Sequence, residues 1–273
     1  MEIKKKTSGI KVQEVKKPFL TGSILDENTL KNCAKFFGQY IMIAFVSFIA
    51  CSSSSFGGDI LRYSLNTLII GAVMMLFYNF GSGNGAEAVT RGEILYQKQE
   101  KGQPISAGER KLCFHKFKGF INALFGMIPF LIPAVILAFC TTLQTTDPGA
   151  LPSWMQSYTR RSDIGNALVN YTQPEGMQFV DYLRALIRIC LLPFVNLIGY
   201  SNKTGMLTME RLSPLLMLLP VAAYGTGYLT GRSIRTRIHT TISENDKKRI
   251  SREKKRQKVR SRSVQHREPE QLN

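Results

Sequence analysis

The sequence has few of the residues from which catalytic and metal sites are built. Its 273 residues include only five Cys and three His, the Cys are widely spaced, and no CxxC pair occurs. Zinc sites use Cys and His at short, recurring spacings, and none of those spacings is present. Paired acids or clusters of Ser and His near the membrane surface are also missing. We therefore predict no enzymatic activity, no catalytic residue, no metal site and no cofactor.

Charge is missing from several long stretches of the chain. Uncharged windows of 23, 24, 28 and 20 residues lie between Lys35 and Asp59, Arg62 and Glu87, Lys118 and Asp147, and Arg211 and Arg232. A helix needs about 20 apolar residues to cross a hydrocarbon core about 30 Å thick. Lipid offers no hydrogen-bond partner to the backbone, so such segments cross as helices. The windows predict an all-α membrane protein with spans at about 36–57, 63–82, 119–142 and 212–231.

The positive charges that the chain does have are unevenly placed. Of 36 Lys and Arg, 29 lie before Phe36, between Glu87 and Lys118, or from Arg232 onward. Basic residues collect on the cytoplasmic side of membrane proteins. Four spans put all three groups on that side, which favours a cell-membrane protein with both termini in the cytoplasm. The chain then divides into a basic arm at 1–35, a transmembrane domain at 36–231 and a basic tail at 232–273.

The segment 177–202 leaves an alternative of five spans. Its first half carries Asp181, Arg184 and Arg188 at spacings of three and four, so the charges share one helical face. This pattern is typical of an interfacial or re-entrant amphipathic helix, although a fifth span stays open. The three charged residues are the candidates for contact with an anion or lipid headgroup. A helix that only anchors the chain is the plainer interpretation.

The tail is dense in charge, has no apolar face and contains no aromatic residue. Residues 244–262 hold ten basic and three acidic side chains. Attraction to anionic lipid, roughly 1 kcal/mol per basic residue near the surface, is sufficient to hold such a tail at the membrane. The predicted lipid-contacting residues are Lys247, Lys248, Arg249, Lys254, Lys255 and Arg256. Binding to nucleic acid would use the same charge but is not favoured, because no aromatic residue can stack on bases.

Glycine and proline mark further positions in the predicted spans. The cluster Gly81, Gly83 and Gly85 follows the second span and predicts a flexible helix end rather than a phosphate-binding loop. Gly227 and Gly231 form a GxxxG pair, which permits close helix approach and is weak evidence for a homo-oligomer. Pro129 and Pro133 predict a kink in the third span, or the lining of a conduit.

These observations give two hypotheses for function. The first is a membrane scaffold or accessory subunit that contacts anionic lipids and membrane-protein partners. The second is a transporter or permease component, with Asn122, the prolines and the Arg184 region along the path. Few ionisable residues lie within the spans, and coupled transporters usually need them. The scaffold hypothesis is therefore preferred.

Overall fold

The described parts of the chain fall into three long stretches. A computed structural model describes residues 14–52, 59–143 and 179–265, together with the single residues 155, 158, 161, 163 and 164. Most of the segment 147–176, which the sequence predicts to be an irregular cap, lies outside these residues. So does His266.

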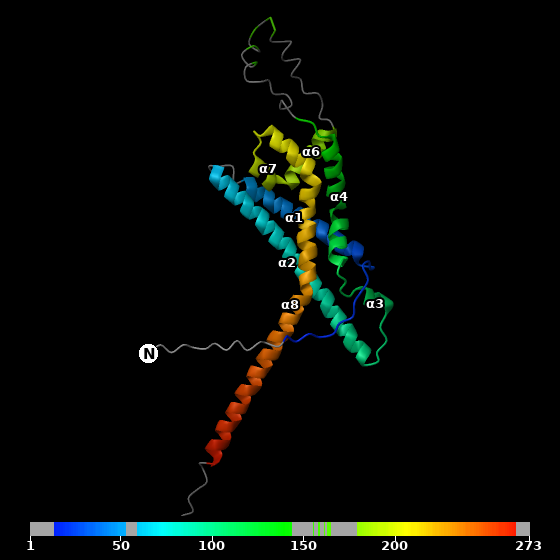
Figure 1. Cartoon of the computed structure of the whole chain (residues 1–273), viewed down its shortest axis with the longest axis vertical. Coiled ribbons are helices and arrows are strands. Elements are labelled where there is room, and N and C mark those ends of the chain that lie inside the picture. Colours follow the sequence, from blue (N-terminus) through cyan, green and yellow to red (C-terminus); the bar gives the residue numbers. More distant parts are fainter. Residues whose placement is uncertain are drawn as a thin grey trace, which may run out of the picture.

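Every regular element in the described stretches is a helix. The helices are α1 (Thr29–Ser52), α2 (Asp59–Glu100), α3 (Ala107–Lys111), α4 (Lys118–Cys140), α6 (Phe179–Cys190), α7 (Leu192–Ile198) and α8 (Lys203–Gln265). Figure 1 shows α6 and α7 at one end of the bundle and α3 towards the other, and we call these the α6 end and the α3 end. Helix α8 runs the length of the bundle and continues past α3.

Four helices confirm the predicted all-α membrane fold. Within the described residues, α1, α2, α4 and α8 are long and apolar enough to cross a membrane. Their apolar side chains outnumber what the bundle interior can hold, so many face outward, such as Phe45, Phe139 and Leu215. Outward-facing apolar side chains in all four helices are what a lipid environment requires.

Two of these helices are much longer than the predicted spans. Helix α2 has 42 residues and α8 has 63, against predicted spans of 63–82 and 212–231. The expectation that the chain becomes flexible after residue 82 is wrong, because Gly81, Gly83 and Gly85 lie in the middle of α2. A window without charges marks only the apolar part of a helix, and a helix can continue into its polar part.

The glycines in the middle of α2 permit a close crossing with α8. A Cβ on Gly81 or Gly85 would lie 2.0 or 2.2 Å from the carbonyl oxygen of Tyr224 or Tyr228. A Cβ on Gly227 would likewise lie 2.1 Å from the carbonyl oxygen of Tyr78. Two small-residue pairs therefore face each other, one on each helix, as in membrane helices that pack backbone to backbone. The GxxxG pair on α8, predicted as a weak sign of a homo-oligomer, is used here within the chain.

The other helices pack around this crossing pair. Helix α4 packs against α8 and α1, and α7 packs against α2. The central core is apolar and closely filled. Side chains that are at most 1% exposed include Phe36, Phe77, Met127, Leu137 and Met217.

The residues before α1 are fixed against the α3 end. The backbone N–H of Leu20 donates to the carbonyl of Gly92 at 3.1 Å, and that of Val15 donates to the Thr240 hydroxyl at 3.1 Å. Asp26 pairs with Lys118 at 2.5 Å, and both side chains are buried. The described part of the predicted basic arm is thus a strap across α2, α8 and the start of α4.

The glycine crossing predicts a sharp difference between two neighbouring substitutions. Gly85→Ala puts a methyl group against the α8 backbone and is expected to cost roughly 1–3 kcal/mol, the usual range for overpacking. Thermal unfolding of the detergent-purified chain should show a lower Tm.

Gly83→Ala is the matched control for this prediction. A Cβ on Gly83 meets nothing within 4 Å, and alanine is the better helix former. Its Tm should equal or exceed that of the wild type. An equal fall in both variants would contradict the backbone-to-backbone crossing.

Candidate functional site

The segment after the third span folds as two short helices. Helix α6 has 12 residues and α7 has 7, and Gly199, whose φ is +83°, ends α7. Neither helix approaches the length of a span. Leu183 and Ile187 are buried against the bundle on one side of α6. The described part of 177–202 therefore has the predicted amphipathic character and supplies no fifth spanning helix.

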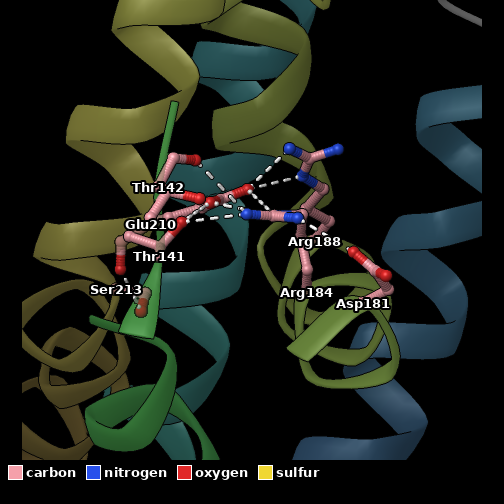
Figure 2. A network of polar contacts seen from close by, with 7 residues as sticks. All are labelled: Thr141, Thr142, Asp181, Arg184, Arg188, Glu210 and Ser213. Carbon is pink, nitrogen blue, oxygen red and sulfur yellow. Dashed lines mark hydrogen bonds and ion pairs between the residues drawn. The ribbon is translucent and has the colours of Figure 1, made fainter. Parts of the chain in front are cut away.

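The charged face of α6 meets a buried carboxylate of α8. Glu210 is 2% exposed and accepts hydrogen bonds from Arg184 Nε at 3.1 Å and Arg188 Nε at 2.9 Å. Figure 2 shows both guanidinium groups directed at this one carboxylate. A buried charge is costly unless it is paired and hydrogen-bonded, and here two cations share that task.

Neighbouring polar groups complete the network. The hydroxyl of Thr141, which follows α4, donates a short hydrogen bond to Glu210. Arg184 Nη1 lies 3.1 Å from Asp181, and its Nη2 donates to Thr141 at 3.2 Å (Figure 2). The network thus joins the end of α4, the charged face of α6 and the first part of α8.

The backbone of α8 is adjusted at the same position. Pro214 has no N–H and cannot donate to the carbonyl of Glu210 one turn earlier. The hydroxyl of Ser213 donates to that carbonyl at 2.7 Å instead (Figure 2). This contact satisfies the backbone where the helix would otherwise lack a hydrogen bond.

The predicted candidates Asp181, Arg184 and Arg188 are brought together, with a protein carboxylate between the two arginines. Two acids and two arginines give the network no net charge. Arg184 is buried and engaged by four protein groups, whereas Arg188 also lines a cavity of about 460 Å³ with Lys203 and Tyr200. The arrangement is well suited to fastening α6 to the bundle. Contact of Arg188 with an anion in the cavity stays a prediction.

Sequence reasoning missed Glu210, because it precedes the uncharged window of the last span. The sequence did contain a signal, because an acidic residue next to an apolar run needs a cationic partner and α6 has two arginines. Reasoning also missed Glu93, which lies 2.8 Å from His239 and 3.0 Å from Arg235. These residues are 146 and 142 positions apart in the chain, and spacing alone could not join them.

The predicted tail residues are held on the exposed last part of α8. The side chains from Lys247 to Arg256 are exposed, and Arg249 forms a 3.8 Å ion pair with Glu253. Within the described stretches, no group of three His, Cys, Asp or Glu side chains is placed to hold a metal ion.

The network predicts a large effect for one neutralising substitution. Glu210→Gln removes the buried carboxylate that Arg184 and Arg188 share, and loss of one partner of a buried pair costs about 3–5 kcal/mol. The Tm of the purified chain should fall. Hydrogen exchange should rise in α6, since α6 loses its main polar attachment.

Glu253→Gln is the control, because it removes an exposed carboxylate of the same helix. Exposed pairs contribute about 0–1 kcal/mol, so its Tm should change little. Unchanged exchange in α6 of Glu210→Gln would contradict the fastening role.

Comparison with known proteins identifies no relative of this chain. The chain matches no protein-family model, no curated protein and no solved structure.

Proposed function

We propose that this chain is a scaffold or accessory subunit of the cell membrane, with both termini in the cytoplasm, and that α8 serves as its arm. The continuity of α8 carries the proposal. One helix extends from Lys203, before the buried Glu210, through the apolar core to Gln265 in the basic tail. A partner bound to the tail is thereby coupled directly to the membrane bundle.

The direction of the arm is fixed where it leaves the apolar region. Glu93 of α2 binds Arg235 and His239 of α8, and all three side chains are largely buried. The N-terminal strap crosses the same region, where Val15 binds Thr240. These contacts support an arm that is held at a set angle to the bundle, as a scaffold requires.

The length of the arm bears on the predicted lipid contact. A helix rises about 1.5 Å per residue, so Lys254 lies roughly 35 Å along the axis from Gly231. Charges are screened over about 8 Å at physiological ionic strength. Lys247, Lys248 and Arg249 are consecutive and so point in three directions around the helix. If the arm is straight, its basic side chains lie too far from the lipid headgroups to be attracted by them, which favours an acidic membrane-protein partner. Lipid contact would require the arm to bend towards the bilayer.

A transport component is the second candidate, and the cavities favour it. Arg188 lines a cavity at the α6 end, and Asn122 lines one of about 350 Å³ at the α3 end. The apolar core, including Phe77 and Met127, lies between these levels. Transport would require this core to open, and Pro129 and Pro133 in α4 would be the hinge.

The scaffold proposal predicts a partner that depends on the charge of the arm. A photo-reactive residue at position 257, activated in cells, should crosslink the arm to a protein. The triple substitution K254Q/K255Q/R256Q should reduce the crosslinked product severalfold, because charge complementarity governs association.

K101Q/K111Q/K116Q removes three exposed lysines elsewhere at the α3 end and should leave the product unchanged. Crosslinks to lipid alone would support the lipid-contacting tail over a protein partner. Equal losses in both triple variants would contradict a specific role for the arm.

The proposed orientation predicts opposite labelling of two introduced cysteines. In a background with Cys140→Ser, which removes the exposed thiol, Asn245→Cys should react with an impermeant maleimide only in inverted vesicles. Arg160→Cys should react in intact cells. Labelling of position 245 from outside would overturn the four-span orientation with a cytoplasmic tail.

A further inference from the structure

A polar cavity lies at the α3 end of the bundle, next to the crossing of α2 and α8. It encloses about 350 Å³ and is lined by α1, α2, α4 and α8. The lining includes Lys31 and Lys35 of α1, Asn84 of α2 and Asn122 of α4. Lys35 and Lys118 are also the last charged residues before the apolar runs of their helices. The cavity therefore lies at the level of lipid headgroups when α1 and α4 cross the membrane.

Two buried polar side chains in the lining have hydrogen-bonding capacity that the described residues do not use. Asn122 and Tyr228 are each 4% exposed. Among the described residues, the amide oxygen of Asn122 has no hydrogen-bond partner, and the Tyr228 hydroxyl, which lies near the backbone of His115, still has its proton to donate. Nearly all buried polar groups in proteins are hydrogen-bonded, so an unpaired one needs an explanation. Both groups come from different helices and line one cavity, which points to a ligand that satisfies them.

The charge of the lining indicates the sign of that ligand. Four cations and two carboxylates line the cavity. Lys118 pairs with Asp26 at 2.5 Å, and Arg91 pairs with Glu87 at 2.7 Å. Lys31 and Lys35 remain one helical turn apart, and no carboxylate of the described residues pairs with either. Like charges at this spacing repel each other, and an anion between them removes the repulsion.

We infer that this cavity binds a phosphate group that carries a neighbouring hydroxyl, as in a phosphoglycerol. The two lysines neutralise the phosphate, and the Tyr228 hydroxyl and the Asn122 N–H groups are donors for its oxygens. A hydroxyl of the ligand donates to the Asn122 amide oxygen. The headgroup of phosphatidylglycerol and soluble glycerol phosphate share this chemistry. The site is independent of the arm and of the network around Glu210.

Native mass spectrometry of the full chain in detergent tests this site. Phosphatidylglycerol should bind, and phosphatidylcholine, whose headgroup has no hydroxyl and no net charge, should bind much more weakly. K31Q/K35Q removes two basic residues near the ligand and should lower the affinity for phosphatidylglycerol roughly 10- to 30-fold. Asn122→Ala keeps the charge and should lower the affinity severalfold, because an amide contact is lost.

K101Q/K116Q is the matched control, since it removes two exposed lysines at the same end but outside the cavity lining. It should bind phosphatidylglycerol as the wild type does. Equal binding by K31Q/K35Q and the control would overturn the proposal, as would equal binding of the two lipids by the wild type. Unchanged affinity in Asn122→Ala would also overturn it, because the buried amide is part of the site.

Glycerol 3-phosphate distinguishes the two sources of the ligand. Displacement of phosphatidylglycerol at millimolar glycerol 3-phosphate would support a site for the soluble anion. Binding of the lipid without such competition would support a headgroup site that also uses the acyl chains. In either case K31Q/K35Q is expected to bind phosphatidylglycerol more weakly than the wild type. Loss of lipid binding in a variant that keeps the wild-type Tm excludes misfolding as its cause.

Discussion

Three buried carboxylates, each neutralised by a cation from another segment, hold this fold together. Glu210 of α8 meets Arg184 and Arg188 of α6, Glu93 of α2 meets Arg235 and His239 of α8, and Asp26 meets Lys118 at the start of α4. A buried charge without a partner is far more costly than a lost apolar contact. Any arrangement of these helices that separated one pair would therefore be strongly destabilised. The pairs thus select one arrangement among helices whose apolar faces alone could pack in several ways.

Some features of this fold could be predicted from the sequence, and others could not. The four spanning helices follow from uncharged windows, since the length of a membrane helix is set by the bilayer. The amphipathic character of α6 follows from the spacing of its charges. The crossing of α2 and α8 does not follow, although the glycines at 81, 85, 227 and 231 were visible. Small residues permit close approach but do not say which two helices will use it.

Half of the network around Glu210 could be predicted from the sequence. Asp181, Arg184 and Arg188 were identified because three charges close to a membrane need an explanation. Their partner was not, because Glu210 lies 26 residues from Arg184 and borders its own span from outside the uncharged window. Once Glu210 is in place, the arginines no longer form a simple anion site. The same charge pattern on α6 is compatible with headgroup contact or with an internal ion pair, and only the position of α8 separates the two.

The two ends of the bundle therefore differ in what their charges still require. At the α6 end, two acids balance two arginines and the backbone carbonyl left by Pro214 has a donor in Ser213. At the α3 end, internal pairs account for Lys118 and Arg91, while Lys31 and Lys35 remain beside an unpaired buried amide. Residual positive charge and an unpaired buried hydrogen-bonding group are features of a binding surface. A contact that only holds helices together has balanced charges and paired polar groups. The arm of α8 leaves the bundle at this same end, so binding of an anion between α1 and α4 would occur beside the helix that carries the tail.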